Sequence, residues 1–448
     1  MKHAIRIVII GGGFAGHRAA RSLARALPDD AGAEIVLVNP TDYLLYLPLL
    51  PEVAAAILDP RSVTISLAET LPGVRLTLGN VSSIDLDHRR VAYTDPEAGD
   101  HELGYDRLIV AVGSVNKLLP IPGVGERAHG FRGVPEAIYL RDHVIRQVEL
   151  AAGGDDREER DARCTFVVVG AGYTGTEVAA QGPLFTAAIA RHHPELGPQR
   201  MRWLLLDVAP RVLPELDERL SRVADRVLRR RGVEVRMGTS VEEATMDGVR
   251  LTTGELVPTR SLIWCVGVRP DPVIEQTGLP TRRGRIVVDP TLAVPGQPGV
   301  FACGDAAAVP DLTRPGRDTP MTAQHATRQG TLAGRNVAAS LGYGRTRWYK
   351  HHDLGFAVDL GGTQAAANPL GIPLSGLPAK AVTRGYHLLS MPGNRVRTVV
   401  DWLLDATLGR QPVQLGLVRS AAVPLDTASP ELPHPGYRLP EDHPARAR

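Results

Sequence analysis

Two sets of regularly spaced glycines are the residues whose types and spacing most clearly indicate chemistry. The pattern G-x-G-x-x-G occurs at Gly11, Gly13 and Gly16 and again at Gly170, Gly172 and Gly175. In this pattern the first glycine allows a tight turn, the second lets a pyrophosphate approach the backbone, and the third lets a helix pack on a strand. The phosphate then lies at the helix N-terminus, where free N–H groups and the helix dipole favour an anion. Two sets in one chain predict two nucleotide sites.

The residue that ends the strand after each glycine set is the second chemical signal. A dinucleotide-binding fold places an acid there to hold the ribose hydroxyls. The first set is followed by Asn39 and the second by Asp207. An amide still hydrogen-bonds a hydroxyl, so Asn39 weakens the first site without removing it. Asp207 favours a free 2′-hydroxyl, hence NADH over NADPH, and Arg211 can soften that preference.

Two later segments supply further polar candidates. A strand ends at Gly304 and Asp305, where an acid can hydrogen-bond a ribityl hydroxyl and a helix start can face a phosphate. The plainer interpretation is that Asp305 is an N-cap. Residues 321–341 are rich in small side chains and predict a long helix. The polar candidates on that helix are Gln324, His325 and Gln329.

Buried parallel strands must position these turns. Runs of β-branched and other apolar residues predict strands at 5–10, 34–38, 105–113, 166–169 and 203–206, and the first glycine set opens a helix at about 14–27. A β-meander is expected over 74–93. The apolar segment 43–53 is either a core loop or the lining of a pocket near the cofactor. Strands alternating with helices predict an α/β fold with two Rossmann-like units.

The character of the chain changes after Trp348. Residues 378–408 predict two short helices broken at 391–393, the second with apolar residues at helical spacing. Trp402 lies beside these residues, and the basic residues flanking them are Lys380, Arg384, Arg395, Arg397 and Arg410. The profile suits a helix in a bilayer interface, with Trp and apolar side chains inserted and basic side chains at the headgroups. A dimer face or a core helix is the alternative. The tail from Ser429 is expected to be mobile.

Bulk composition excludes several classes of function. The 448 residues carry 51 Lys and Arg against 49 Asp and Glu, a net charge of +2, which gives no reason to expect nucleic acid. The three cysteines are far apart and form no CxxC pair, which argues against a disulfide framework, a metal site or a redox dithiol. We expect no signal peptide, because a core strand begins within the first residues, and no membrane-spanning run of about 18 apolar residues.

These segments together resemble the type II NADH dehydrogenases, which are single-subunit NADH:quinone oxidoreductases among the two-dinucleotide-domain flavoproteins. The resemblance spans about residues 5–416. It is carried by IVIIGGGFAG, DYLLYLPLLPEVA, YDRLIVAVGS, VVVGAGYTGTEVAAQ, FACGDAA, TAQHATRQG and PGNRVRTVVDWLL. The glycine motifs indicate fold and cofactors, and the helix at TAQHATRQG with the C-terminal segment indicates quinone reduction.

The resemblance implies a domain order and a set of site residues. The FAD-binding domain would comprise 1–118 and 288–345, the NAD(P)H-binding domain 119–287, and a C-terminal docking or dimer region 346–448. FAD would be held by Gly11, Gly13, Phe14, Ala15, Gly16, Asn39, Gly113, Gly304 and Asp305; NADH by Gly170, Gly172, Tyr173, Thr174, Gly175, Asp207 and Gly267. Glu177 would lie near nicotinamide and flavin. Gln324 would lie at the quinone end of the flavin, with Pro48 and His325 nearby.

The implied reaction is hydride transfer from NADH to flavin and transfer of two electrons to a membrane quinone, without proton pumping. Three departures from the family pattern stand out: Asn39, Arg328 with Gln329 in place of paired glutamines, and a C-terminal region that matches in part. The alternatives are a sulfide:quinone oxidoreductase, a soluble reductase of a protein acceptor and a flavin redox sensor. The location we expect is the cytoplasmic side of the membrane or the cytoplasm. A homodimer is compatible with the sequence.

Overall fold

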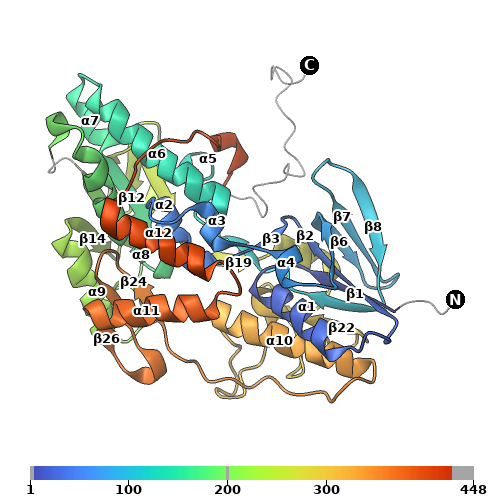
Figure 1. The fold of residues 1–448 in the computed structure, drawn as a ribbon. Coiled ribbons are helices and arrows are strands. Elements are labelled where there is room, and N and C mark those ends of the chain that lie inside the picture. The colour runs from blue at the N-terminus through green and yellow to red at the C-terminus, as the bar shows by residue number, and fades with distance from the viewer. Residues whose placement is uncertain (1–4, 198–200, 426–448) are drawn as a thin grey trace.

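Two five-stranded parallel sheets organise the chain in this computed structural model, which describes residues 5–197 and 201–425 (Figure 1). The first sheet has the order β22-β9-β1-β2-β5, and all its neighbours are parallel. Its strands are β1 (Ile5–Ile10), β2 (Ala33–Asn39), β5 (Arg75–Leu78), β9 (Arg107–Val110) and β22 (Val300–Ala302). The edge strand β22 therefore comes from a much later part of the chain than the other four.

Two helices pack tightly against each other on this first sheet. They are α1 (Phe14–Ala26) and α10 (Ala323–Ser340). A Cβ added at Gly330 would lie 2.0 Å from the carbonyl oxygen of Ala15, and one at Gly334 would lie 2.4 Å from that of Ala19. The small residues that predicted a long helix at 321–341 thus let α10 approach the backbone of α1.

The second sheet has the order β11-β18-β12-β13-β14, and its neighbours are again parallel. Its strands are β11 (Ala128–His129), β12 (Thr165–Val169), β13 (Arg202–Asp207), β14 (Val233–Met237) and β18 (Ser261–Trp264). The helices around it are α6 (Val134–Ala152), α7 (Arg157–Arg163), α8 (Tyr173–Ala190) and α9 (Glu218–Arg230). The predicted α/β fold with two Rossmann-like units is confirmed.

Each parallel sheet is interrupted along the chain by a three-stranded antiparallel sheet. The first comprises β6 (Asn80–Asp85), β7 (Arg90–Thr94) and β8 (Asp100–Gly104); the second comprises β15 (Val241–Ala244), β16 (Gly248–Leu251) and β17 (Leu256–Pro258). The predicted meander at 74–93 is partly wrong, because its first strand, β5, joins the parallel sheet beside β2. The meander instead runs from β6 to β8.

Short strands and turns connect the two units. Antiparallel pairing joins β10 (Ser114–Asn116) to β19 (Val268–Pro270), which brings residues that follow Gly113 and Gly267 side by side. The remaining connections are α5 (Val124–Arg127), the 3₁₀ turn η4 (Pro272–Thr277), and the small sheet of β20 (Thr281–Arg282), β21 (Arg285–Val287) and β23 (Ala307–Ala308).

The apolar segment at 43–53 is well ordered into short elements and largely buried. It forms β3 (Tyr43–Leu45), the 3₁₀ turn η1 (Leu47–Leu49) and α2 (Leu50–Ala54), followed by α3 (Pro60–Val63), β4 (Thr64–Ser66) and α4 (Leu67–Thr70). Tyr46, Leu50 and Val53 are core residues, whereas Leu45 and Leu47 line a cavity described below. Both interpretations of the segment therefore hold for different residues.

The C-terminal part lies across one face of the molecule (Figure 1). It consists of β24 (Ala357–Asp359), β25 (Ala365–Ala367), β26 (Leu374–Ser375), α11 (Gly376–Ser390) and α12 (Arg395–Leu408). The two predicted helices and the break between them are present. Among the described residues, none of the helices is long and apolar enough to cross a bilayer. The tail from Ser429 lies outside the described residues.

Candidate active site

The first glycine set forms the tight turn between β1 and α1. Gly11 has φ +93°, and a Cβ there would lie 2.4 Å from the carbonyl oxygen of Ala111. A Cβ on Gly16 would lie 1.7 Å from the carbonyl oxygen of Gly11. By contrast, a Cβ on Gly13 would meet no protein atom within 4 Å. The fold therefore requires the outer two glycines, while Gly13 leaves space open at the start of α1.

The second glycine set repeats this geometry between β12 and α8. Gly170 has φ +105°, with a Cβ position 2.2 Å from the carbonyl oxygen of Cys265, and a Cβ on Gly175 would lie 1.8 Å from that of Gly170. The middle glycine, Gly172, again has no neighbour within 4 Å. Both middle glycines thus leave the helix N-terminus accessible to a phosphate.

The residue at the end of the second strand holds the glycine turn in each unit. Asn39 Oδ1 accepts a hydrogen bond from Gly12 N at 2.6 Å, and its Nδ2 donates to the carbonyl oxygen of Thr41 at 2.8 Å. Asp207 accepts from Ala171 N at 2.5 Å and from Ala209 N at 2.7 Å. Arg211 donates to the carbonyl oxygen of Pro214 at 2.9 Å.

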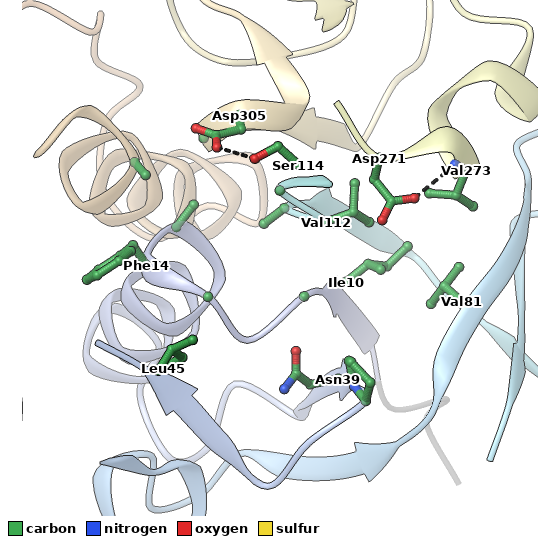
Figure 2. A pocket seen from close by; sticks show the side chains of 18 of the residues that line it. Ile10, Phe14, Asn39, Leu45, Val81, Val112, Ser114, Asp271, Val273 and Asp305 are labelled. Atoms are coloured by element: carbon green, nitrogen blue, oxygen red, sulfur yellow. Dashed lines mark hydrogen bonds between the residues drawn. The ribbon is translucent and has the colours of Figure 1, made fainter. Parts of the chain in front are cut away.

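A cavity of about 340 Å³ opens in front of the first glycine turn, a volume within the range of small-molecule sites (Figure 2). Eight of the residues expected to hold a dinucleotide line it: Gly11, Gly13, Phe14, Ala15, Asn39, Gly113, Gly304 and Asp305. Gly16 lies behind them, against Gly11. The cavity gathers these residues from β1, α1, β2, and the ends of β9 and β22.

Arg132 and Asp271 also line this cavity, and sequence reasoning missed both. Arg132 lies just before α6. Burial lowers the pKa of its guanidinium group, and the nearby carboxylates of Asp305, Glu136 and Asp271 oppose that shift by favouring the charged form. Asp271 caps η4 by accepting from Val273 N at 2.9 Å (Figure 2). The position of Asp271 after the loop at Gly267 is a weak signal, whereas Arg132 has none, because only the tertiary fold brings it here.

Asp305 points its carboxylate at Ser114 rather than capping a helix. Its Oδ2 accepts from Ser114 Oγ at 2.7 Å (Figure 2), and Cys303 precedes the short 3₁₀ turn η5 (Gly304–Ala306). The predicted helix start at this point is wrong, because η5 runs directly into β23 and α10 begins only at Ala323. Gln329 fixes the turn from α10, since its Oε1 accepts from Gly304 N at 2.8 Å.

Glu177 belongs to a cluster of buried charged groups between the two units. Its Oε1 accepts from Asp359 N at 2.9 Å, and burial raises its pKa well above the usual value, with Asp359 and Glu52 adding to the rise. Lys380 Nζ donates to Asp359 Oδ2 and lies 4.0 Å from Glu52 Oε1. Burial raises the pKa of Glu52 to about 7. Such a group of strongly shifted acids is typical of a functional site.

Gln324 and His325 lie on the first turn of α10 and contact the segment before β24. Gln324 Oε1 accepts from Leu354 N at 2.8 Å and lies 2.7 Å from His351 Nε2. His325 Nδ1 lies 2.7 Å from Tyr349 Oη, and its Nε2 lies 2.9 Å from Asp353 Oδ1. The structure does not place Gln324, His325, Glu177 or Pro48 in the wall of the cavity.

The remaining predicted residues surround the second glycine turn and the link to the first unit. Tyr173 opens α8 and stacks on Phe356 at 5.6 Å between ring centroids, with Thr174 next to it. Gly267 has φ +97° and an open Cβ position. It follows β18, just as Gly113 follows β9.

Comparisons with known proteins agree with this geometry. Residues 5–330 match the family model of pyridine nucleotide-disulphide oxidoreductases. The chain is 30% identical over 418 residues to the type II NADH:quinone oxidoreductase Ndh of Mycobacterium tuberculosis, covering 89% of this chain and 87% of that protein. It is 29% identical over 407 residues to the demethylphylloquinone reductase NdbB of Synechocystis, covering 89% and 95%.

A solved structure shows the same fold across nearly the whole chain. The NDH2 of Plasmodium falciparum, determined in complex with NADH, superposes with a TM-score of 0.83 at 16% identity. The match covers 92% of this chain and 100% of that one. It includes the C-terminal part in addition to the two dinucleotide-binding units.

Proposed function

The chain belongs to the pyridine nucleotide-disulphide oxidoreductases and, within them, to the type II NADH:quinone oxidoreductases, and from this premise we propose that it oxidises NADH with a membrane quinone as acceptor and FAD as resident cofactor. The observation that carries the proposal is the pair of strand–glycine–helix units whose middle glycines, Gly13 and Gly172, are both left open. FAD, held by the first unit, would supply the two-electron chemistry that links a hydride donor to a quinone.

The residues of the first unit fit FAD. Gly13 leaves room for a pyrophosphate at the start of α1, and Arg132 supplies a cation in the same cavity. Asp305 offers the carboxylate oxygen not used by Ser114 to a ribityl hydroxyl. Asn39 already uses its Oδ1 for Gly12 and its Nδ2 for Thr41. Its remaining capacity for a ribose hydroxyl is one lone pair, less than an acid offers.

The second unit would hold NADH. Gly172 and the N-terminus of α8 would receive its pyrophosphate, with Tyr173 and Thr174 on the first turn of that helix. Each Asp207 oxygen accepts one backbone hydrogen bond and keeps a lone pair for a ribose hydroxyl. A 2′-phosphate would meet the charge of this carboxylate, and the Arg211 guanidinium is turned to Pro214. This arrangement supports NADH over NADPH.

Glu177 would act at the meeting point of nicotinamide and flavin. Because burial raises its pKa well above the usual value, this carboxyl holds a proton more readily than an exposed glutamate and would do so beside the reacting rings. Glu177→Gln keeps the acceptor for Asp359 N and removes the titration. The expected result is a lower kcat with a flatter pH profile. An unchanged turnover and profile would remove Glu177 from this role.

The quinone would be received near Gln324, with Pro48 and His325 beside it. The Oε1 atom of Gln324 is engaged by Leu354 N and His351. Its amide nitrogen, Nε2, is the donor that would hydrogen-bond a quinone carbonyl. Gln329 is buried and holds Gly304 and Thr319, so it is a positioning residue. Gln324→Leu should raise the KM for quinone and leave the KM for NADH unchanged, while Gln324→Glu tests the need for a donor.

The experiment that tests the function follows NADH absorbance in flavin-replete protein mixed with a short-chain quinone. Controls use oxygen alone as acceptor and sulfide in place of NADH. Quinone-dependent oxidation at rates typical of enzymes, about 1–1,000 per second, is the expected result. Flavin that is reduced by NADH but hardly passes electrons to quinone would contradict the proposal and favour a protein acceptor or a redox sensor.

The properties of Cys265 and Cys303 argue against sulfide oxidation by a cysteine pair. Burial raises the pKa of the Cys265 and Cys303 thiols to about 12 each. Thiolates, the reactive form, are therefore scarce at neutral pH. The two residues also follow strands of different sheets: Cys265 comes after β18 of the second sheet, and Cys303 comes after β22 of the first.

We also propose peripheral docking on the cytoplasmic face of the membrane through α11 and α12, as a homodimer or a monomer. The support is the outward apolar face of α12, where Val396 is 78% and Leu408 81% exposed. The core-helix interpretation of this stripe is wrong. So is the expected membrane insertion of Trp402, which is 6% exposed and donates its Nε1 to Glu52 at 2.5 Å.

The basic residues expected at the headgroups divide into two sets. Lys380 is buried with Asp359, Arg410 pairs with Asp405 at 3.5 Å, and Arg384 stacks over Trp402. Arg395 and Arg397 are exposed at the start of α12. Only these last two therefore remain available to a headgroup.

A further inference from the structure

Six arginines from three helices gather beside the exposed apolar face of α12. They are Arg18, Arg21 and Arg25 on α1, Arg335 on α10, and Arg395 and Arg397 on α12. Two adjoining concavities share Arg18 and Arg21: one lies between α1 and the start of α12, the other between α1 and α10. Figure 1 shows α1, α10 and the start of α12 approaching one another on this side. We call these six residues the arginine cluster.

The arginines of the cluster are not paired with carboxylates in the described part of the chain, although Asp59 lies near enough to Arg397 for that charge to help lower the pKa of Asp59. Within residues 5–197 and 201–425, none of the six forms an ion pair. Burial lowers the pKa of Arg18, and the charges on Arg21, Arg25 and Arg395 lower it further. Arg395 donates only to the carbonyl oxygens of Met391 and Leu389, at 3.1 and 3.2 Å. These guanidinium groups therefore repel one another and are available to an external anion.

Within the described residues, Asp401 is the one acid that lines the groove between α1 and α12, and one of its two carboxylate oxygens is engaged by α3. Asp401 accepts hydrogen bonds from Asp59 N at 3.0 Å and from Ser62 Oγ at 2.5 Å, which turns its carboxylate toward α3. The basic helix α9 offers a contrast, because Arg222 pairs with Glu218 at 2.7 Å and Arg229 with Asp225 at 3.0 Å. Two of the arginines on α9 are therefore balanced by acids of the same helix, which is true of none of the arginines in the cluster.

The same groove also has apolar walls. Leu389, Val396 and Val400 line it together with Arg18 and Arg21, and all three apolar side chains are exposed. Arginine binds phosphate through several N–H donors in a planar fork. Exposed Leu and Val side chains match the acyl region just below a headgroup. Cations and apolar side chains in one groove fit an amphipathic anion rather than a free one.

We propose that the groove between α1 and α12 binds the phosphates of anionic phospholipids, so that the arginine cluster seats the protein on a negatively charged bilayer. The proposal rests on the membrane docking proposed above and adds the lipid class and the role of α1. Two regions far apart in sequence then face the bilayer together: α12 supplies the apolar contact and two of the six arginines, and α1 supplies three of them.

Vesicle sedimentation with the flavin-replete protein tests this proposal. The vesicles are pure phosphatidylcholine, or phosphatidylcholine with one third phosphatidylglycerol, at low and at physiological salt. We expect tight binding to the anionic vesicles that weakens as salt rises, because the attraction is screened. Arg18→Gln/Arg21→Gln/Arg25→Gln should lower the partition coefficient on anionic vesicles by about a hundredfold, since each basic residue contributes about one kcal/mol near such a surface.

The matched control removes the same charge from α9. Arg219→Gln/Arg226→Gln/Arg230→Gln changes three exposed arginines that form no ion pair within the described ranges. This variant should bind anionic vesicles as the wild type does. Because Arg18 and Arg21 are half-buried, a second test variant, Arg25→Gln/Arg335→Gln/Arg397→Gln, changes only exposed side chains. All these variants should keep wild-type NADH oxidation with a short-chain quinone in the absence of lipid.

The outcomes separate this inference from the docking on which it rests. Equal binding of wild type to neutral and anionic vesicles, or equal loss in the α9 control, would overturn the phospholipid proposal and leave docking intact. No binding to any vesicle would overturn the docking itself. Val396→Ser/Leu403→Ser/Leu408→Ser should weaken binding to both kinds of vesicle. Tighter binding to duplex DNA than to anionic vesicles, lost in the α1 variant, would also overturn the proposal.

Discussion

The two strand–glycine–helix units share a backbone and differ in the side chain that closes them. The strand order β9-β1-β2-β5 of the first is repeated as β18-β12-β13-β14 in the second. A Cβ on Gly16 or Gly175 would meet the first glycine's carbonyl oxygen at 1.7 or 1.8 Å. Asn39 closes the first turn and Asp207 the second, each by accepting a backbone N–H. An acceptor oxygen at this position is therefore enough to hold the turn, whether it belongs to an amide or to a carboxylate. The negative charge of Asp207 is not needed for that purpose and is available to select the nucleotide.

The units also differ in what surrounds them. The first turn faces a cavity whose wall includes Arg132 and Asp271, from the segments that precede α6 and follow β19. The sheet of the first unit is completed by β22, and the turn at Gly304, which follows β22 and lines the cavity, is held by Gln329 from α10. The second unit builds its sheet from a continuous stretch, β11 to β18. A resident cofactor fits the first environment, and a substrate that must enter and leave fits the second.

The largest effect that sharpens this comparison is expected from the middle glycines. Gly13→Ala and Gly172→Ala each place a methyl group where no protein atom lies within 4 Å, so the fold should tolerate both. We expect Gly13→Ala to weaken flavin retention by about tenfold or more, because the methyl group occupies the phosphate position. Gly172→Ala should keep its flavin and raise the KM for NADH by a similar factor. Flavin absorbance after gel filtration and steady-state kinetics distinguish the two.

These paired variants can also break the comparison. Gly16→Ala is the control for a lesion of the fold, because its methyl group would collide with Gly11. Flavin loss in Gly172→Ala, or normal flavin with impaired NADH use in Gly13→Ala, would reverse the assignment of the two units.

A smaller effect is expected from neutralising Asp207. Asp207→Asn keeps an oxygen for Ala171 N but removes the charge and one of two acceptors. The ratio of kcat/KM for NADH to that for NADPH should fall roughly tenfold, because a 2′-phosphate is no longer repelled. Steady-state rates with both nucleotides provide the measurement. An unchanged ratio would show that nucleotide selection depends on other residues.

A third prediction concerns Glu52, which lies where the two units meet. Its pKa is about 7 in the folded protein, above the usual value near 4.5, so folding favours its protonated form. The folded state then binds more protons than the unfolded one between about pH 4.5 and 7, and stability falls as pH rises through that window. Glu52→Gln should remove a loss of up to a few kcal/mol, measured by denaturant unfolding at pH 5 and pH 7.5.

The comparison with Glu52→Ala separates charge from contact. Glutamine keeps an oxygen for Trp402 Nε1, whereas alanine removes it. Glu52→Ala should therefore be less stable than Glu52→Gln at both pH values. A residual slope is expected in both variants, because Glu177 also has a raised pKa. Identical pH profiles of wild type and Glu52→Gln would contradict the prediction.

The smallest effect is expected from giving the first unit the acid of the second. Asn39→Asp keeps an acceptor for Gly12 N but places a carboxylate oxygen where Nδ2 now donates to the carbonyl oxygen of Thr41. The lost hydrogen bond should lower the free energy of unfolding by about 1 kcal/mol. Thermal and urea unfolding provide the measurement, with Asp207→Asn as the matched exchange. A more stable Asn39→Asp would mean that Thr41 turns away at little cost.

The sequence predicted the parts of the fold that rest on local pattern. A glycine triplet between an apolar strand and a helix has few other solutions, so both turns, α10 and the break between α11 and α12 were predictable. Strand β5 was misassigned because residues 75–78 are short and only partly apolar, and a parallel partner at Val36 to Asn39 cannot be inferred from them. The α/β class did not depend on that strand.

Site residues could be predicted where a motif lies within one helix or strand and its adjoining turn. Residues that reach the site only because separate elements pack together were missed. Periodicity identified the apolar stripe of α12 but not which side faces the protein, so Trp402 and Lys380 were expected outside. Arg18, Arg21 and Arg25 follow helical spacing, yet their proximity to Arg395 depends on how α12 packs on α3. Arg132 has no sequence signal for the same reason.

The late strand β22 has a consequence for synthesis of the protein. About 190 residues separate the end of β9 from the start of β22, which pairs with it. At roughly 5–20 residues per second, the ribosome needs on the order of 10–40 seconds to supply that partner. The second sheet, β11 to β18, emerges whole within this interval. During this interval the edge of β9 has no partner on the side that β22 later covers, and an unpaired strand edge can pair with another chain.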